Sequence, residues 1–329
     1  DPAINHTEQP MDLAFLNASI ETSVGAPKDP WFSNESVSYY YFGYWMMGVL
    51  SELTSIPSNV SYNLSLSIVA AMAAQCCFGL VFSIVSSASN SLRATYTVSF
   101  FAIVLLGISS NLEGVLEFMR ANVIGSQNFW NWIGISGLTE PLTSVSESWA
   151  PTEFWWWFRA SRVINTFQGG EGLDYTIQEF PFFSFMLGDL HAHALAIPFA
   201  LVLITFCWSI LKSETLNWKL TNCRTGVFIV VLSIVLGGLA FTNMWDLPTY
   251  VGLLFGTCIL KSYSAVHLRS QAGESSGDTG NSVWVLIAIS SSVASFIFFS
   301  PYYTSLNMSV DGIGSVQEIT TRPIHFFIV

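Results

Sequence analysis

The feature that most constrains this chain is a series of long apolar runs. A helix needs roughly 20 mostly apolar residues to cross a bilayer. Runs of about that length lie at 62–88, 95–118, 184–211, 225–243, 247–263 and 283–300. Only 10% of the residues are charged, and the mean hydropathy is +0.50, whereas soluble domains carry about a quarter charged residues. The sequence therefore predicts an all-α polytopic protein of the plasma membrane or an equivalent membrane.

The basic residues between the runs predict its orientation. Lysine and arginine lie in the connections 89–94 and 212–224 and flank 264–282. These connections alternate correctly if all three face the cytoplasm, since cytoplasmic loops are enriched in basic residues. Four arginines on the opposite side weaken this pattern; they are Arg120, Arg159, Arg162 and Arg322.

The predicted organisation alternates outer segments with membrane helices. Its parts are an outer first loop at 1–61, two transmembrane helices at 62–118, a long outer loop at 119–183, three transmembrane helices at 184–263, a cytoplasmic linker at 264–282, a transmembrane helix at 283–300, and an outer loop with the start of a further span at 301–329. The run 39-YYYFGYWMMGVLSEL-53 is too short to span and rich in Tyr and Trp. Such a run is typical of a helix lying at the membrane interface. The first residue is not Met and the last run is apolar, which indicates a fragment of a longer protein.

Charge and cysteine content exclude two classes of function. The net charge is −11 and no basic cluster occurs, so no nucleic-acid partner is expected. The five cysteines have no CxxC or other metal-binding spacing. We expect them to be small core or lipid-facing residues.

A polar group interrupts the apolar run 180-FPFFSFMLGDLHAHALAIPF-199. It contains Asp189, His191 and His193, which offer oxygen and nitrogen ligands at every second position. In an extended segment all three side chains point to one face, and this set suits a divalent metal such as Mg or Mn, or a phosphate. Alternatively, Asp189 caps a helix and the two histidines bond the backbone. The predicted topology puts the group at the outer rim of a span, where ionisable residues usually face a cavity.

Two further acids lie on the predicted outer side. Asp12 begins a helix-like apolar pattern, so it is either a first-turn acid that stabilises the helix or a catalytic base. Asn243 and Asp246 lie in 242-TNMWDLPTY-250, between two spans. They either cap a tight helical hairpin or line an outer cavity.

Two acids precede the tryptophan run of the long outer loop, and two arginines follow it. Glu113 and Glu117 are one helical turn apart and share a face. Two such carboxylates raise at least one pKa unless a cation intervenes. Arg159 and Arg162, in 154-FWWWFRASRVI-164, are the partners that the sequence offers for these acids. They either pair with these acids or bind a phosphate, whose geometry a guanidinium matches.

Glycosylation-type sequons also fall on the predicted outer side or at its boundary. The candidate asparagines are Asn5, Asn17, Asn34, Asn59, Asn63 and Asn307. They agree mildly with the orientation, because such acceptors lie on extracytoplasmic surfaces.

Several of these motifs together resemble a known family. They are 8-EQPMDLAFLNA-18, 38-SYYYFGYWMMGVLSEL-53, 155-WWWFRASRVI-164, 179-EFPFFSFMLGDLHAHALAIPF-199, 242-TNMWDLPTY-250 and 312-GIGSV-316. In this order, along nearly the whole chain, they resemble the YYY-type membrane proteins (the Chlor_Arch_YYY family). The architecture is in turn similar to that of the GT-C superfamily of membrane glycosyltransferases, an analogy at the level of the fold.

The resemblance implies a sugar transfer at the outer face of the membrane, from a polyprenyl-phosphate-linked donor. Asp12 matches the acid of the first outer loop and would be the general base. Asp189, His191 and His193 would be the second-loop set that holds a metal or the phosphate. The first loop lacks an Asp-x-Asp pair, which departs from the GT-C pattern and leaves metal dependence open.

Two other functions remain compatible with the sequence. One is a non-catalytic scaffold that binds other membrane subunits through its outer loops. The other is a transporter, which we rank last because the spans lack charged residues at mid-membrane depth. In the enzyme, Asp12 and the two histidines should converge on one outer site.

Overall fold

The computed structural model describes residues 3–5, 8–32, 35–109, 111–141, 148–153, 156–168, 171–213, 218–271, 283–306 and 321–329. The chain forms two compact units. The first comprises Asp1–Ile103 and Gly188–Ser309, and the second comprises Val104–Leu187 and Val310–Val329. Four helices within the described ranges are long and apolar enough to cross a membrane. The predicted class, an all-α polytopic membrane protein, is confirmed.

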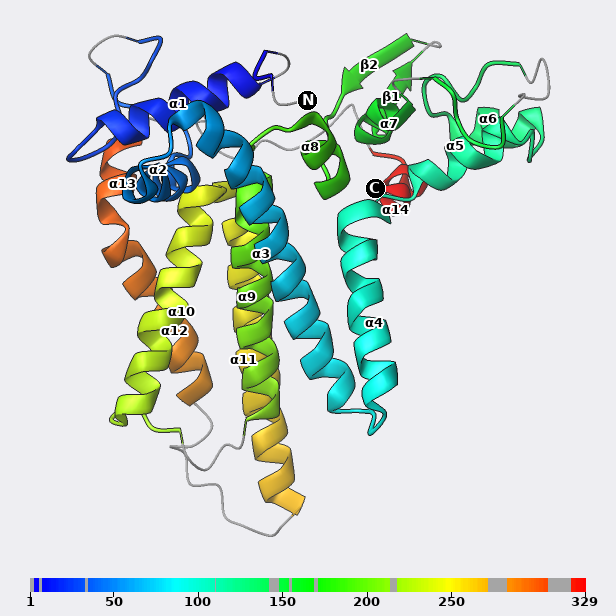
Figure 1. Cartoon of the computed structure of the whole chain (residues 1–329). Coiled ribbons are helices and arrows are strands. Elements are labelled where there is room, and N and C mark those ends of the chain that lie inside the picture. Colours follow the sequence, from blue (N-terminus) through cyan, green and yellow to red (C-terminus); the bar gives the residue numbers. More distant parts are fainter. Residues whose placement is uncertain are drawn as a thin grey trace. The chain divides into compact units, whose positions relative to one another are not determined.

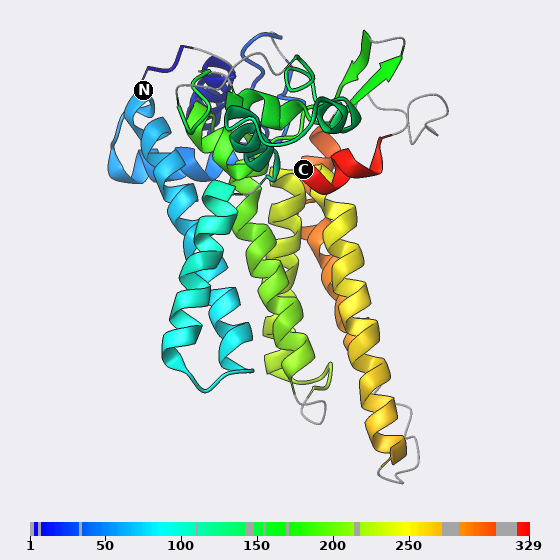
Figure 2. The ribbon, with the colours of Figure 1, turned by 90° about the vertical axis from the view of Figure 1, so that its right-hand side faces the viewer.

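The first unit is a helical bundle built from two distant parts of the chain. Its elements are α1 (Gln9–Glu21), α2 (Phe42–Thr54), α3 (Ser58–Ser86), α4 (Leu92–Val104), α9 (Ala192–Lys212), α10 (Cys223–Thr242), the 3-10 turn η4 (Met244–Asp246), α11 (Leu247–Gln271), α12 (Val283–Phe298) and α13 (Ser300–Ser305). α9 packs on α3, α10 and α11, while α12 packs on α10 and α11. Figure 1 shows α1 and α2 lying across one end of this bundle, and Figure 2 shows α9, α10 and α11 running side by side.

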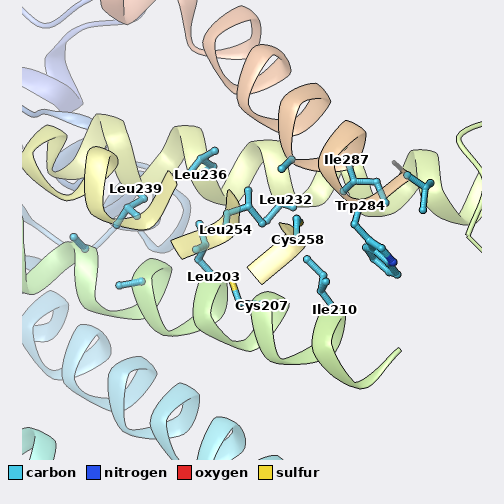
Figure 3. Packing of buried hydrophobic residues seen from close by; sticks show 14 residues of the cluster. Leu203, Cys207, Ile210, Leu232, Leu236, Leu239, Leu254, Cys258, Trp284 and Ile287 are labelled. Carbon is cyan, nitrogen blue, oxygen red and sulfur yellow. The ribbon is translucent and has the colours of Figure 1, made fainter. Parts of the chain in front are cut away.

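The core of this unit lies where α9 to α12 face one another. Its labelled members are Leu203, Cys207, Ile210, Leu232, Leu236, Leu239, Leu254, Cys258, Trp284 and Ile287 (Figure 3). All of these side chains are buried, as expected for helices that are apolar around most of their circumference. The buried thiols of Cys207 and Cys258 are free, in agreement with their predicted role as small core residues.

Two adjacent glycines in α10 allow a close approach of aromatic rings. A Cβ atom at Gly237 would lie 2.2 Å from the ring of Phe299. A Cβ at Gly238 would lie 2.8 Å from Phe199 and 3.3 Å from Phe42. Small residues at helix interfaces let neighbouring elements pack closely in membrane proteins, and here they bring α2, α9 and the start of α13 against α10.

The aromatic run predicted as a short helix at 39–53 forms α2. Tyr44 and Met47 are buried, while Trp45 and Leu53 are exposed. The helix ends at Ser55, which has a φ of 56° in the left-handed region that terminates helices. One face of α2 therefore packs against α1 and α10, and the other face remains an exposed apolar surface.

The second unit is smaller and mixed in its secondary structure. Its elements are the π-helical turn η1 (Leu105–Ser109), α5 (Glu113–Ala121), α6 (Gln127–Ile133), α7 (Trp156–Arg159), the 3-10 turn η2 (Ala160–Arg162), β1 (Asn165–Gln168), β2 (Glu171–Tyr175), α8 (Pro181–Leu187) and α14 (Pro323–Ile328). The strands form an antiparallel hairpin with an irregularity between Thr166 and Phe167. The sequence predicts only a loop over 119–183, so the hairpin was not anticipated.

The predicted span at 184–211 is wrong at its start. α8 ends at Leu187, and α9 begins only at Ala192. Gly188 has a φ of +78°, a left-handed conformation that favours glycine and stops a helix. His191 is extended, with a ψ of 151°. The polar group of the sequence thus lies in and around an irregular segment between two helices.

The other predicted boundaries differ less. The span predicted at 95–118 ends at Ser109, and a new helix begins at Glu113, whose backbone N–H is bonded by the side chain of Asn111 at 2.7 Å. α11 continues to Gln271, into the predicted linker, and 272–282 lie outside the described residues. The apolar run near 325 forms a six-residue helix within the second unit.

Candidate functional site

The candidate site lies where the start of α1 meets the irregular segment 188–191. A Cβ at Gly188 would lie 3.2 Å from the side-chain amide nitrogen of Gln9, so α1 packs closely against this segment. α1 begins at Gln9 with Pro10 in its first turn, where proline is tolerated. These local features place the first-turn acid of α1 beside the polar group of the sequence.

Asp12 is completely buried and is bonded to two tyrosines. The hydroxyl of Tyr44 donates to Oδ1 of Asp12 at 2.6 Å, and the hydroxyl of Tyr62 lies 3.4 Å from Oδ2. Glu8 occupies the N-cap position of α1, with no capping bond from its side chain. The carboxylate of Asp12 therefore points into the packed interior, toward partners 32 and 50 residues away.

Tyr62 joins three segments at this point. Its hydroxyl accepts from the backbone N–H of Leu190 at 3.1 Å and lies 3.2 Å from the carbonyl oxygen of Gly188. A hydroxyl has a single proton, so the tyrosine shares it between this carbonyl and the Asp12 carboxylate. The hydrogen bonds tie α1, α3 and the segment 188–191 together.

The two histidines face each other at the solvent side of the site. Nδ1 of His191 lies 2.9 Å from Nδ1 of His193, and Nε2 of His191 lies 3.0 Å from a carboxylate oxygen of Glu8. Only one of the two facing nitrogens can carry a proton in such a contact. The side chain of His191 is 19% exposed and that of Glu8 is 50% exposed, so this pair is in contact with solvent.

Burial and charge together shift the ionisation of Asp12. Burial raises its pKa from the ordinary 3.8 to about 7, against the hydrogen bond from Tyr44 and the charge of His191, which lower it. The negative charges of Asp189 and Glu8 raise it further. Asp12 is therefore about half ionised at neutral pH.

Asp189 and Asp246 are two further acids of the candidate site. Asp189 is buried, and its charge acts on Asp12. Asp246 lies in η4, its backbone N–H bonded to the carbonyl of Asn243. Burial raises the pKa of Asp246, while a side-chain bond from Asn243 and the charge of His193 lower it. The tight hairpin of the sequence prediction is present, and it also brings Asp246 within electrostatic range of His193.

These donors favour a transition ion over magnesium. The donors that could hold an ion are the imidazoles of His191 and His193, with facing nitrogens 2.9 Å apart, and the carboxylate of Glu8. Imidazole suits zinc and other transition ions, whereas magnesium prefers oxygen ligands alone. Manganese, the other predicted ion, fits the carboxylates of this mixed set.

The charged group of the second unit is an ion-pair cluster. Arg159 bonds both carboxylate oxygens of Glu117, at 2.7 and 3.0 Å, and also Glu153 at 2.7 Å. The pairing predicted as one alternative is therefore formed, and the charge of Arg159 is offset by two carboxylates. Arg162 lies 3.7 Å above the ring of Phe158.

Glu113 is a buried acid beside this ion pair. Its carboxylate is buried beside that of Glu117, whose charge and hydrogen bond both act on it. Burial and the neighbouring charge of Glu117 raise its pKa to about 10. Glu113 is consequently neutral at physiological pH, and this agrees with the raised pKa that the spacing of the two glutamates predicts.

The sequons differ in their surroundings. Asn5 and Asn59 are exposed, whereas Asn17 is half-buried within α1 and the serine of its sequon, Ser19, is buried. A glycan acceptor needs an exposed loop, so Asn17 is not a suitable acceptor. Asn34 and Asn307 lie outside the described residues.

Three side chains of the candidate site were not identified as site residues from the sequence. Tyr44 belongs to the aromatic run that predicts an interfacial helix, Tyr62 lies inside a span, and Glu8 stands in a polar terminal segment. Interfacial and core tyrosines are common. The only sequence signal for Tyr44 and Tyr62 is that each carries a hydroxyl, which must find a partner if it is buried.

Comparison with known proteins gives a family but no activity. A family model described as "Uncharacterized membrane protein (DUF2298)" matches residues 1–329. No curated protein and no solved structure matches the chain.

Proposed function

Because the chain belongs to the DUF2298 family of uncharacterized membrane proteins along its whole length, we propose its function from the site: transfer of a sugar from a polyprenyl-phosphate carrier to an acceptor hydroxyl on the extracytoplasmic side of the membrane. This is the reaction class of the GT-C glycosyltransferases, which the motifs resemble through the YYY-type proteins. The resemblance supplies the class of donor, and the geometry around Asp12 supplies the chemistry.

One observation carries the proposal, namely the complete burial of Asp12 against the hydroxyls of Tyr44 and Tyr62. A general base works best when its pKa lies near the working pH, and the pKa of Asp12 is raised to about 7. Strongly shifted carboxylates with a specific charge partner are typical of functional sites. Here that partner is His191, whose charge lowers the pKa of Asp12 and whose Nε2 contacts the exposed carboxylate of Glu8.

In the proposed step, Asp12 accepts the proton of the acceptor hydroxyl while the acceptor oxygen attacks the anomeric carbon. The bond between that carbon and the phosphate oxygen breaks, and its electrons leave with the polyprenyl phosphate. Oδ1 is held by Tyr44 at 2.6 Å, so Oδ2 is the oxygen that takes the proton. Its contact with Tyr62 is 3.4 Å, long enough to be exchanged for a bond to the acceptor.

The histidines lie where they can balance the charge of the leaving phosphate. The His191–His193 pair is positively charged when the two facing Nδ1 atoms share one proton and both Nε2 atoms each hold another. Hydrogen bonds from an imidazolium to a phosphate are strong because both partners are charged. A divalent ion held by the same two nitrogens would supply positive charge at that place.

The proposal is tested with the purified chain in lipid nanodiscs. The substrates are radiolabelled polyprenyl-phosphate mannose and polyprenyl-phosphate glucose, and loss of label from the carrier is measured. We expect Asp12→Asn to reduce turnover by about a thousandfold or more, because a neutral amide cannot accept the proton; general bases contribute about 10²–10⁴-fold.

Asp29→Asn is the matched control. Asp29 is another acid of the same segment, and its carboxylate bonds the backbone N–H groups of Trp31 and Phe32 at 2.8 Å in a local turn. This variant should keep wild-type turnover. Equal turnover by Asp12→Asn and the wild type, or no turnover of either donor by the wild type, contradicts the proposal and favours a scaffold subunit.

A further inference from the structure

An apolar groove lies in the second unit, at the end of a membrane helix. The span Leu92–Ser109 ends in the π-helical turn η1, and the groove begins there. Its volume is about 380 Å³, within the usual range for small-molecule sites of roughly 300–1,000 Å³. It is lined by Ile108, Ser109, Asn111, Leu112, Gly114, Val115, Phe118, Trp156, Trp157, Ala160, Phe180 and Phe182.

The rim of the groove is apolar and open. Ile108, Leu112 and Val115 are each more than half exposed, although they are aliphatic. Contiguous exposed apolar surface marks an interaction site for protein, ligand or membrane. The aromatic wall behind it, with Trp156 and Phe180 among its members, has the composition of the belt at a membrane–water boundary.

The position of the groove indicates what covers this surface. It opens beside the final turn of a helix that is long and apolar enough to cross a membrane, so hydrocarbon chains are the molecules present at its mouth. At roughly 30 Å³ for each small group, the volume of one water molecule in the liquid, the groove holds about a dozen methylene-sized groups. That capacity fits part of one lipid chain.

We propose that this groove binds the isoprenoid tail of a polyprenyl phosphate, with Arg162 as the ligand of the phosphate. The inference rests on the proposed function for its choice of lipid. Arg159, three residues earlier, is already paired with Glu117 and Glu153, whereas Arg162 bonds the hydroxyl of its neighbour Ser161 and interacts through its charge with Glu179. The other N–H groups of the Arg162 guanidinium can form paired hydrogen bonds with phosphate oxygens.

Aromatic contacts connect Arg162 to the groove. Its guanidinium carbon lies 3.7 Å from the centre of the Phe158 ring and 5.8 Å from that of Phe183. The Phe183 ring in turn contacts two groove residues, Trp157 at 5.7 Å and Phe180 at 5.9 Å. Cation–π contacts hold an arginine in place, so the Phe183 ring lies between the charge of Arg162 and the apolar wall of the groove.

A glycine in the wall permits a test that fills the groove. A Cβ at Gly114 would meet only a ring carbon of Trp156, at an ordinary 3.7 Å, and leucine has a higher helix propensity than glycine. Gly114→Leu should therefore leave α5 folded while it occupies the groove. Gly107→Leu is the matched control, because a Cβ at Gly107 has no neighbour within 4 Å and Gly107 does not line the groove.

The probe is a polyprenyl phosphate with a photoreactive benzophenone on its tail, crosslinked to the full chain in nanodiscs and mapped by peptide mass spectrometry. We expect crosslinks within 108–118 and 156–182, about tenfold weaker in Gly114→Leu, a loss of about 1.4 kcal/mol, and unchanged in Gly107→Leu. Arg162→Gln should weaken capture of the phosphate probe but not of the matching polyprenol. Thermal unfolding midpoints verify that the variants are folded.

Three outcomes overturn the inference. The first is crosslinking outside these segments, and the second is equal capture by Gly114→Leu and the wild type. The third is equal competition by phosphatidylglycerol, which would make the occupant an ordinary membrane phospholipid. Failure of the sugar-transfer proposal looks different, since Asp12→Asn would then match the wild type in turnover while the crosslink pattern persisted.

Discussion

Removing one hydroxyl tests the proposed role of Asp12 most directly. Tyr44→Phe deletes the donor that lies 2.6 Å from Oδ1 of Asp12 and keeps the ring. Tyr44 is completely buried, and its ring packs against Phe15 with centroids 5.6 Å apart. No other group needs to move, so the substitution changes mainly the hydrogen bonding of the carboxylate.

The size of the effect follows from the difference between two hydrogen bonds. A bond to an ionised group contributes about 1.5–3 kcal/mol and a bond to a neutral group about 1 kcal/mol. Losing the donor therefore disfavours the ionised form by about 1.4 kcal/mol, which raises the pKa by about one. The pKa of Asp12 moves from about 7 to about 8. At pH 7 the ionised fraction falls from about one half to about one tenth, and at pH 9 the two forms of the protein differ little.

The assay is turnover of the labelled polyprenyl-phosphate sugar between pH 5 and pH 10. We expect the acidic limb of the profile to move up by about one pH unit, with about a fivefold loss at pH 7 and recovery near pH 9. Tyr302→Phe is the matched control, since Tyr302 is also buried and its hydroxyl has no hydrogen-bond partner within the described residues. If the limb stays in place in Tyr44→Phe, or moves equally in both variants, Asp12 is not the base.

Other consequences of the packing can be measured as thermal unfolding in detergent. Asp12→Asn should stabilise the protein above pH 7. The pKa of Asp12 is raised in the folded state, so the wild type loses about 4 kcal/mol of stability as the pH rises from 3.8 to about 7. Equal unfolding midpoints of the two proteins at pH 8 would refute this. Glu113→Gln should change stability little at pH 7, because the pKa of about 10 keeps this acid neutral. Glu117→Gln breaks a bidentate arginine pair and should destabilise by about 3 kcal/mol; similar midpoints for the two glutamate variants would contradict the assignment. Gly237→Ala should destabilise by about 1–3 kcal/mol, because its Cβ would lie 2.2 Å from a phenylalanine ring. Gly252→Ala, which meets no neighbour, should not, and a reversed order would mean that α10 packs differently.

The membrane class and most span positions were predictable because they depend on local properties. Apolar length is read directly from consecutive residues. The predicted run 225–243 corresponds closely to α10, at Cys223–Thr242. The error at 184–211 arose because hydropathy does not register a left-handed backbone at one glycine. Phe185 and Met186 lie in α8, before that break, and count as much toward apolar length as the residues of α9.

The candidate site was predictable in part. Asp12, Asp189 and the two histidines stand out because ionisable residues are few in this chain. Two arginines of identical appearance in the sequence differ in the structure, because Arg159 is surrounded by carboxylates and Arg162 by aromatic rings. Spacing along the chain carries no information about partners from other elements.

The sequence by itself determined that this chain is a helical membrane protein with its acids and histidines gathered at the helix ends, because the transfer of apolar side chains into lipid is a sum over neighbouring residues. Only the tertiary structure decided the state of Asp12. Its pKa depends on burial of the inner face of α1 and on Tyr44 and His191, which are 32 and 179 residues away. Desolvation and hydrogen bonding act through space over a few ångströms, so the folding of distant segments onto one another had to be known before a buried first-turn acid could be recognised as a base.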